Sequence, residues 1–239
     1  MAFNLLIIDT ETTGLNPEDD RVIELGAILY NVDYQTVLHQ ISMLCPAPEN
    51  PAEKINRIPS SVLPTIEPNL QRWMLLTFEQ MVKHASYAVA HNAEFDRQWF
   101  DDRHLPKLMK EDRPMQWLCT MDDFTWPRQN RPGESLVTLA LAHGIGVSSA
   151  HRALTDCQLI AALFDRMDKD QLSELIAAAA RPKYLFKADV SYDDRQLAKD
   201  AGFKWNPDRK MWTRKMVEED TQLLPFRVVK IQQPLSLAA

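Results

Sequence analysis

The spacing of apolar residues along the first 44 positions predicts three β-strands. Residues 3–9 form a short, β-branched run without helical periodicity, which is typical of a buried strand. Two further runs, 21–30 and 34–44, are joined by a turn around residues 31–33. These strands are expected to form an N-terminal meander. Six prolines between positions 46 and 68 then leave room only for short helical turns.

Helices and strands alternate in the next part of the pattern. Apolar residues recur at helical spacing over 69–85, and a short apolar strand follows at 87–90. Asn92 is placed to cap a helix through His104, because acidic residues follow it in the first turn. The pattern predicts one more strand at 117–120 and three more helices, at 135–143, 152–167 and 170–180. This order predicts an α/β fold with a mixed sheet flanked by helices.

Charge is divided unevenly along the 239-residue chain. The net charge is −6, but residues 181–215 hold ten Lys and Arg against five Asp, so the remaining residues carry −11. Residues 181–183 are therefore the expected boundary between a catalytic domain (1–180) and a small, basic α+β accessory module (184–230). The module is expected to run strand, helix, turn at 206–208, strand. Its cations suit phosphate contacts, whereas Trp205 and Trp212 suit either a single-strand binding surface or the small module's own core.

The composition is that of an ordinary soluble globular protein, with 45% hydrophobic and 25% charged residues. The longest apolar stretches are far too short for a membrane span, and no basic leader precedes the first apolar run. Three scattered cysteines without a C-x-x-C pair indicate buried, reduced thiols. These features predict a cytoplasmic protein with no membrane partner.

Two acids close the first predicted strand. Asp9 and Glu11 are two positions apart, so strand alternation places their carboxylates on the same face. Like charges at that separation raise each other's pKa unless a cation compensates them. Considered alone, the pair is equally consistent with a strand end that enters solvent.

Two later segments also combine acids with histidine. In "HNAEFD" (91–96), capping and helix-dipole effects explain Asn92 and one acid, but they do not require Asp96 in particular. In "HRALTDC" (151–157), five helical positions correspond to roughly 140° of rotation. His151 can therefore approach Asp156 only if His151 lies in the loop or the first turn. Alone, this segment is consistent with a surface histidine and a surface acid.

Together, the three segments resemble the DEDD superfamily of exonucleases. "DTETTGL", "HNAEFD" and "HRALTDC" match the three motifs of its histidine-bearing type, to which the proofreading epsilon subunit of bacterial DNA polymerase III belongs. The resemblance covers roughly residues 4–170, and no expected catalytic position is missing. It implies a ribonuclease-H-like fold and a metal-dependent 3′→5′ exonuclease.

The resemblance also implies roles for individual residues. Phosphodiester hydrolysis requires stabilisation of charge on the attacking water, the phosphorus oxygens and the leaving 3′ oxygen, which two divalent cations supply. Hard oxygen ligands suit Mg²⁺ or Mn²⁺. His151 is the implied general base toward water. The implied metal ligands are Asp9, Glu11, Asp96 and Asp156, and the implied substrate contacts are Thr12, Thr13, Gly14 and Asn92.

The expected substrate is nucleic acid with a free 3′ end, in particular single-stranded DNA, in proofreading or repair. Relatives with the same motifs trim RNA ends, so an exoribonuclease stays open. A different class is also open, a non-catalytic nucleic-acid-binding or polymerase-binding protein on the same fold. The final "QQPLSLAA" superficially fits a Gln-x-x-Leu-x-Leu clamp-binding peptide, but so loose a match carries no weight. A polymerase accessory subunit is a third possibility, with a polymerase or a sliding clamp as the candidate partner.

Overall fold

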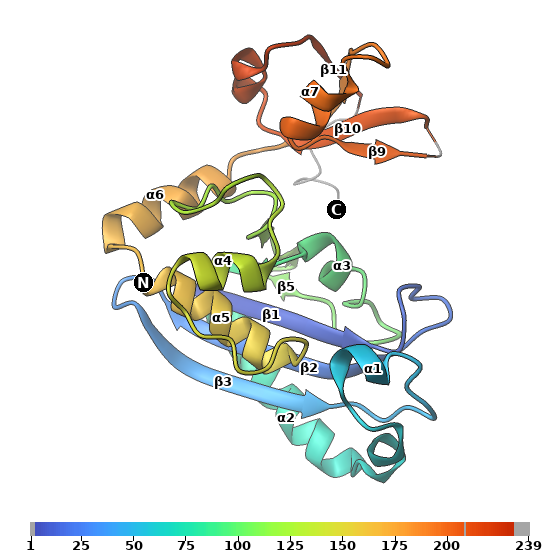
Figure 1. Cartoon of the computed structure of the whole chain (residues 1–239). Helices are drawn as coiled ribbons and strands as arrows, with labels where there is room; N and C mark the ends of the chain where they lie inside the picture. The colour runs from blue at the N-terminus through green and yellow to red at the C-terminus, as the bar shows by residue number, and fades with distance from the viewer. Residues whose placement is uncertain (1–2, 208, 232–239) are drawn as a thin grey trace.

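A five-stranded mixed sheet forms the centre of the molecule (Figure 1). The computed structural model describes residues 3–207 and 209–231. The strand order is β3-β2-β1-β4-β7, in which the first three strands are antiparallel and the last two run parallel to β1. This confirms the predicted mixed sheet. The strands are β1 (Asn4–Thr12), β2 (Val22–Asn31), β3 (Thr36–Leu44), β4 (Tyr87–Ala90) and β7 (Trp117–Cys119).

Strand β1 is longer than the sequence predicts. Its ladder with β2 continues past Asp9, pairing Glu11 with Glu24 and Thr12 with Val22, with a register shift between Glu11 and Thr12. The expectation that the strand ends at Asp9 is therefore wrong. Thr10 and Thr12 are buried, and backbone pairing with β2 offsets the low apolar content of this stretch. The two acids consequently project from a rigid, paired strand.

Helices cover both faces of the sheet. Alternate β1 residues point to opposite sides, Leu5 and Ile7 toward one core and Leu6 and Ile8 toward the other. Helices α4 (Leu136–Ala142), α5 (Ala153–Phe164) and α6 (Lys169–Ala179) pack on the first side, and α2 (Pro68–His84) packs on the second. The remaining small elements are α1 (Glu53–Asn56), the 3-10 helix η1 (Ser60–Thr65), β5 (Met109–Lys110) and β6 (Arg113–Pro114).

The helix predicted over 92–104 is much shorter in the structure. Helix α3 spans only Ala93–Arg97, and Asn92 precedes it without a side-chain capping bond in the described part of the chain. Both predictions, the long helix and the Asn92 cap, are wrong. The Asp101 carboxylate accepts backbone N–H groups of Arg103 (2.9 Å) and His104 (2.8 Å), and such local bonds compete with helix continuation.

A second, four-stranded antiparallel sheet lies at one end of the molecule (Figure 1). Its order is β11-β8-β10-β9, and a small core of five buried residues joins it to α7. The predicted order strand, helix, turn, strand is confirmed, although β9 and β11 were not expected. These elements are β8 (Tyr184–Ala188), α7 (Arg195–Asp200), β9 (Lys204–Asn206), β10 (Met211–Met216), the 3-10 helix η2 (Glu219–Leu223) and β11 (Val228–Lys230).

Ion pairs connect this module to the larger body. Lys215 pairs with Glu94 of α3 at 3.1 Å, and Lys204 pairs with Asp122 at 3.2 Å. The division into domains at 181–183 stays a prediction, and the tail motif at 232–239 lies outside the described residues. Among the helices that the structure describes, none has both the length and the apolar character that crossing a bilayer requires.

Candidate active site

The site is built on β1, where Asp9 and Glu11 project from the same face. In the ladder, Asp9 lies opposite Gly26 of β2. A Cβ atom at Gly26 would lie 2.3 Å from the carbonyl carbon of Ala153, which is shorter than any real contact. The missing side chain therefore allows the first turn of α5 to lie directly on β2. This close approach brings the start of α5 to the acids of β1.

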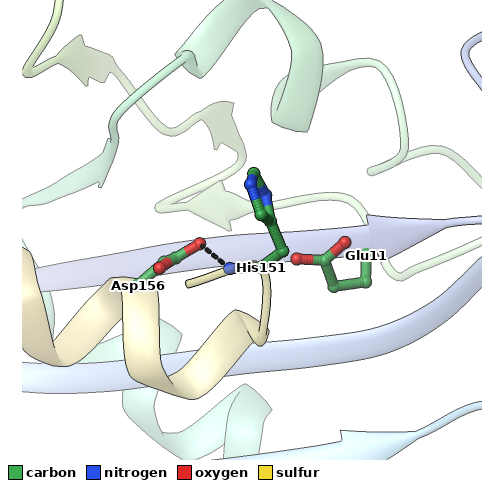
Figure 2. Close-up of side chains that lie close together, drawn as sticks. All are labelled: Glu11, His151 and Asp156. Atoms are coloured by element: carbon green, nitrogen blue, oxygen red, sulfur yellow. Dashed lines mark hydrogen bonds between the residues drawn. The ribbon is translucent and has the colours of Figure 1, made fainter. Parts of the chain in front are cut away.

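His151 and Asp156 enter the site from the start of α5. His151 is exposed, has a positive φ of 62° and lies in the loop before the helix, whereas Asp156 lies in the first turn. The backbone N–H of His151 donates to Asp156 Oδ2 at 3.2 Å. Ligand atoms of Glu11, His151 and Asp156 all lie within 4.8 Å of one another. Figure 2 shows the three side chains close together. This agrees with the placement of His151 that the helical rotation demands.

Asp96 reaches the site from α3 and is almost fully buried. Its Oδ1 accepts hydrogen bonds from the backbone N–H of Thr10 (3.0 Å) and from the Thr10 hydroxyl (2.8 Å). Because Thr10 lies between Asp9 and Glu11, these two bonds fix α3 against the acidic part of β1. The structure thus brings together all four carboxylates and the histidine that the sequence motifs indicate.

The four carboxylates form a strongly negative centre. Burial first, and then the charges of the other three acids, raise the pKa of Asp9 well above its usual range. Burial followed by Asp156 raises the pKa of Glu11 to about 8. Burial also raises the pKa of Asp96 to about 7 and that of Asp156 to about 6, against the hydrogen bonds that lower both. Within the described residues, none of the four pairs with Lys or Arg.

Glu24 is a fifth buried carboxylate that the sequence analysis missed. It accepts hydrogen bonds from Arg152 Nε (3.0 Å) and Nη2 (2.9 Å), from the Ala153 N–H (3.1 Å) and from the Ser42 hydroxyl (3.0 Å). A charged residue inside the otherwise apolar run "VIELGAILY" was a signal that could have revealed it. Since Arg152 follows His151, this ion pair anchors the loop that carries the histidine.

The side chains of the turn after the acids are used inside the turn itself. The Thr12 hydroxyl donates to the Gly14 carbonyl at 2.6 Å, and the Thr13 hydroxyl donates to Asp20 at 3.0 Å. A Cβ atom at Gly14 would lie 2.3 Å from the Asp20 carboxylate, so glycine permits this packing. Asn92 is exposed at the start of α3. Substrate contact by these four residues stays a prediction.

His91 serves the fold. Its ring nitrogens bond Thr120 Oγ1 and the Glu134 carbonyl, both at 3.0 Å, and burial lowers its pKa. This favours a neutral imidazole that ties together the ends of β4 and β7 and the loop before α4. His91 is therefore a hydrogen-bonded histidine at the end of a strand.

The donor set fits divalent cations. Four carboxylates converge, and among residues 3–207 and 209–231 none of them is ion-paired with Lys or Arg. Buried charges of one sign are costly unless a cation compensates them. Carboxylate oxygens are the ligands that hard cations such as Mg²⁺ and Mn²⁺ prefer.

Comparisons with known proteins also point to an exonuclease. A family model described as "Exonuclease" matches residues 6–164, and one described as a domain of unknown function (DUF8626) matches residues 184–231. The chain is 33% identical over 165 residues to the DNA polymerase III subunit epsilon of Treponema pallidum, covering 66% of this chain and 74% of the relative. It is 30% identical over 125 residues to the oligoribonuclease of Thiobacillus denitrificans, covering 45% of this chain and 68% of the relative.

A solved structure of E. coli exonuclease I in complex with a dT13 oligonucleotide has a TM-score of 0.58 and 18% identity. The match covers 83% of this chain and 50% of that one, and it supports the ribonuclease-H-like fold alone. Members of the matched family depend on divalent metal, which agrees with the donor set above. The chain therefore belongs to the exonuclease family and is a 3′→5′ exonuclease.

Proposed function

We propose that this exonuclease removes nucleotides from the 3′ ends of single-stranded DNA in proofreading or repair. The observation that carries the metal-dependent mechanism is the convergence of four carboxylates, none of which forms an ion pair with Lys or Arg in the described part of the chain. Two bound divalent cations would stabilise the charge that develops on the attacking water, the phosphorus oxygens and the leaving 3′ oxygen. The proposed ligands are Asp9, Glu11, Asp96 and Asp156.

His151 is the proposed general base. It lies on the exposed rim of the site, between the carboxylates of Asp156 and Glu11 (Figure 2). An imidazole in that position can take a proton from water, and the neighbouring carboxylates stabilise the positive charge that it then carries. The Glu24–Arg152 pair holds its loop in place.

DNA is favoured over RNA because the match to the DNA polymerase III subunit epsilon covers 74% of that relative, more than the 68% covered in the oligoribonuclease. The oligoribonuclease relative makes RNA the natural alternative outcome of a test. We assign catalysis to residues 1–180, with the turn 12–14 and Asn92 beside the terminal nucleotide, and an accessory role to 184–230. A polymerase or a sliding clamp as partner stays a prediction.

The test uses purified protein with single-stranded DNA and RNA of matched sequence, labelled at the 5′ end. Stepwise shortening is expected with Mg²⁺ or Mn²⁺ and none with EDTA. Asp9→Ala should remove it, because losing a metal ligand costs several kcal/mol of transition-state stabilisation, at least about a thousandfold in rate. His151→Ala should slow it by roughly 10²- to 10⁴-fold. His39→Ala, which removes an exposed histidine on β3, is the matched control.

The ratio of the DNA and RNA rates then decides the substrate class. Faster shortening of RNA would replace the DNA assignment and leave the mechanism intact. No shortening of either polymer, with binding retained, would overturn the catalytic proposal and favour a binding protein on this fold.

A further inference from the structure

The β9–β10 hairpin carries two tryptophans in different environments. Trp205 and Trp212 are register partners, so their rings share one face of the sheet, edge to face with centroids 5.5 Å apart. Trp212 packs against the small core of the module, whereas Trp205 is 49% exposed and is not among the described residues of that core. Packing in the module's own core therefore accounts for Trp212, but it does not account for the exposed Trp205.

Several cations belong to the hairpin and to the helix beside it. The Lys199 ammonium lies over the Trp212 ring at 5.7 Å from its centroid, and Lys204 precedes Trp205 on the edge strand. Arg209 and Lys210 are exposed at the turn of the hairpin. Residues 204–215 contain five Lys and Arg and a single Asp. A flat aromatic surface among cations has the chemistry that recognises an unpaired base and its phosphates.

Arg214 extends these cations toward the catalytic body. It lies two positions after Trp212, hence on the same face of β10, and its guanidinium donates to the Ala201 carbonyl at 2.7 Å. Within the described residues it forms no ion pair. Arg214 lines an open pocket together with the loop between β7 and α4. The polar residues that this loop contributes to the pocket include Asp122, Thr125, Gln129, Asn130 and Arg131.

The acid in this pocket is already compensated. Both Asp122 oxygens lie 3.2 Å from the Lys204 ammonium, which neutralises the charge of this acid. Arg131 and Arg214 therefore give the pocket a positive charge that a ligand can meet. In Figure 1 the yellow-green loop reaches from the body toward the module. A Cβ atom at Gly202 of the module would lie 3.2 Å from Pro132 of this loop, so the two parts meet there.

The same loop is fixed to the catalytic site. His91 bonds Thr120 at the start of the loop and Glu134 at its end. His91 also directly precedes Asn92 and α3, which carries Asp96. His91 therefore connects the loop that lines the pocket with the segment that carries Asp96.

We propose that the β9–β10 hairpin and the adjoining pocket are a second binding site, for the single-stranded part of the substrate away from its 3′ end. Trp205 stacks on a base, while Arg209, Lys210 and Arg214 contact phosphates. Single-stranded nucleic acid is the favoured ligand because base faces are accessible to a side chain only when they are unpaired. The identity of the strand as substrate rests on the proposed function, but its binding is measured separately.

The experiment measures binding of the full chain, in EDTA, to labelled oligothymidylates of about 20 and about 4 nucleotides. Trp205→Leu should weaken binding of the longer strand by about 5- to 100-fold, the cost of one lost stacking contact, and Trp205→Phe should retain most of it. The salt dependence of binding is the slope of the logarithm of the binding constant against the logarithm of the salt concentration. In the double variant Arg209→Gln/Lys210→Gln this slope should become shallower by roughly 0.7 for each lost phosphate contact. Hydrolysis of the short strand with Mn²⁺ should not change in any of these variants.

Trp73→Leu is the matched control, since Trp73 is 70% exposed on α2, which packs on the other face of the central sheet. Equal binding of the longer strand by wild type, Trp205→Leu and the charge variant would overturn the proposal, as would an equal loss in Trp73→Leu. If Trp205→Leu unfolds, the charge variant decides alone. Wild type that binds the long strand through the hairpin but shortens no DNA would refute the proposed function and leave this site standing.

Discussion

Glu11 and Glu24 lie opposite each other on neighbouring strands, yet the structure treats their charges in opposite ways. Glu24 is 1% exposed and is fully satisfied by Arg152, Ala153 and Ser42. Glu11 shares its surroundings with Asp9, Asp96 and Asp156, and its pKa rises to about 8. One carboxylate is neutralised by the protein's own cation, and the other is not.

The difference separates structural acids from ligands for an external cation. A buried acid that anchors the chain carries its counter-charge with it, because an unpaired buried charge is costly. Acids that await a metal must tolerate one another in its absence, at the expense of stability. Three experiments can break or sharpen this comparison.

The largest effect is expected when the structural pair is broken. Arg152→Gln leaves Glu24 buried without its cation, which should lower the free energy of unfolding by about 3 kcal/mol, at the low end for buried pairs because Arg152 is partly open to solvent. Urea unfolding at neutral pH measures it. Arg103→Gln, which breaks an exposed pair with Glu18, should cost less than about 1 kcal/mol. Equal effects of the two variants would refute the distinction.

A change of opposite sign is expected at Glu11. In EDTA, Glu11→Gln should raise the free energy of unfolding by about 2 kcal/mol, because it removes one of the mutually repelling acids. Added Mn²⁺ should stabilise wild type more than the variant, since the variant has lost a ligand. Thermal melts with EDTA or Mn²⁺ test both statements. Glu24→Gln should instead destabilise the protein in both conditions, and a stabilised Glu24→Gln would contradict the comparison.

The smallest effect is expected when the pH of the metal-free protein is changed by a single unit. The folded-state pKa values of Asp156, Asp96 and Glu11 are raised to about 6, 7 and 8. The folded protein therefore holds protons that the unfolded chain has released, so this stability is present below about pH 4 and is lost as the pH rises toward 8.

The expected loss is about 1 kcal/mol per pH unit over this range. Urea midpoints in EDTA between pH 5 and 8 provide the measurement, and saturating Mn²⁺ should flatten the profile. Stability that rises with pH in EDTA would show that the four acids carry a counter-charge after all.

The order of the elements and the identity of the clustered acids were predictable, because each depends on local sequence. Continuous apolar runs mark β1 and β2, and helical rotation allowed His151 to approach Asp156 only from the loop or the first turn of α5. The helix over 92–104 was not predictable from periodicity. The helix already ends at Arg97, and Trp99 and Phe100 beyond it pack in the core. The Asp101 carboxylate bonds backbone N–H groups that a longer helix would use.

The sequence by itself determined which residues are proposed to carry the chemistry, since residue type sets charge, basicity and ligand hardness. Only the tertiary structure decided how they meet. Gly26 lets α5 approach β2, Thr10 ties Asp96 to β1, and Arg152 neutralises Glu24. It also decided that Trp212 packs, partly buried, against the core of the module while Trp205 stays exposed. Such outcomes depend on distances between segments far apart in the chain, which no local pattern encodes.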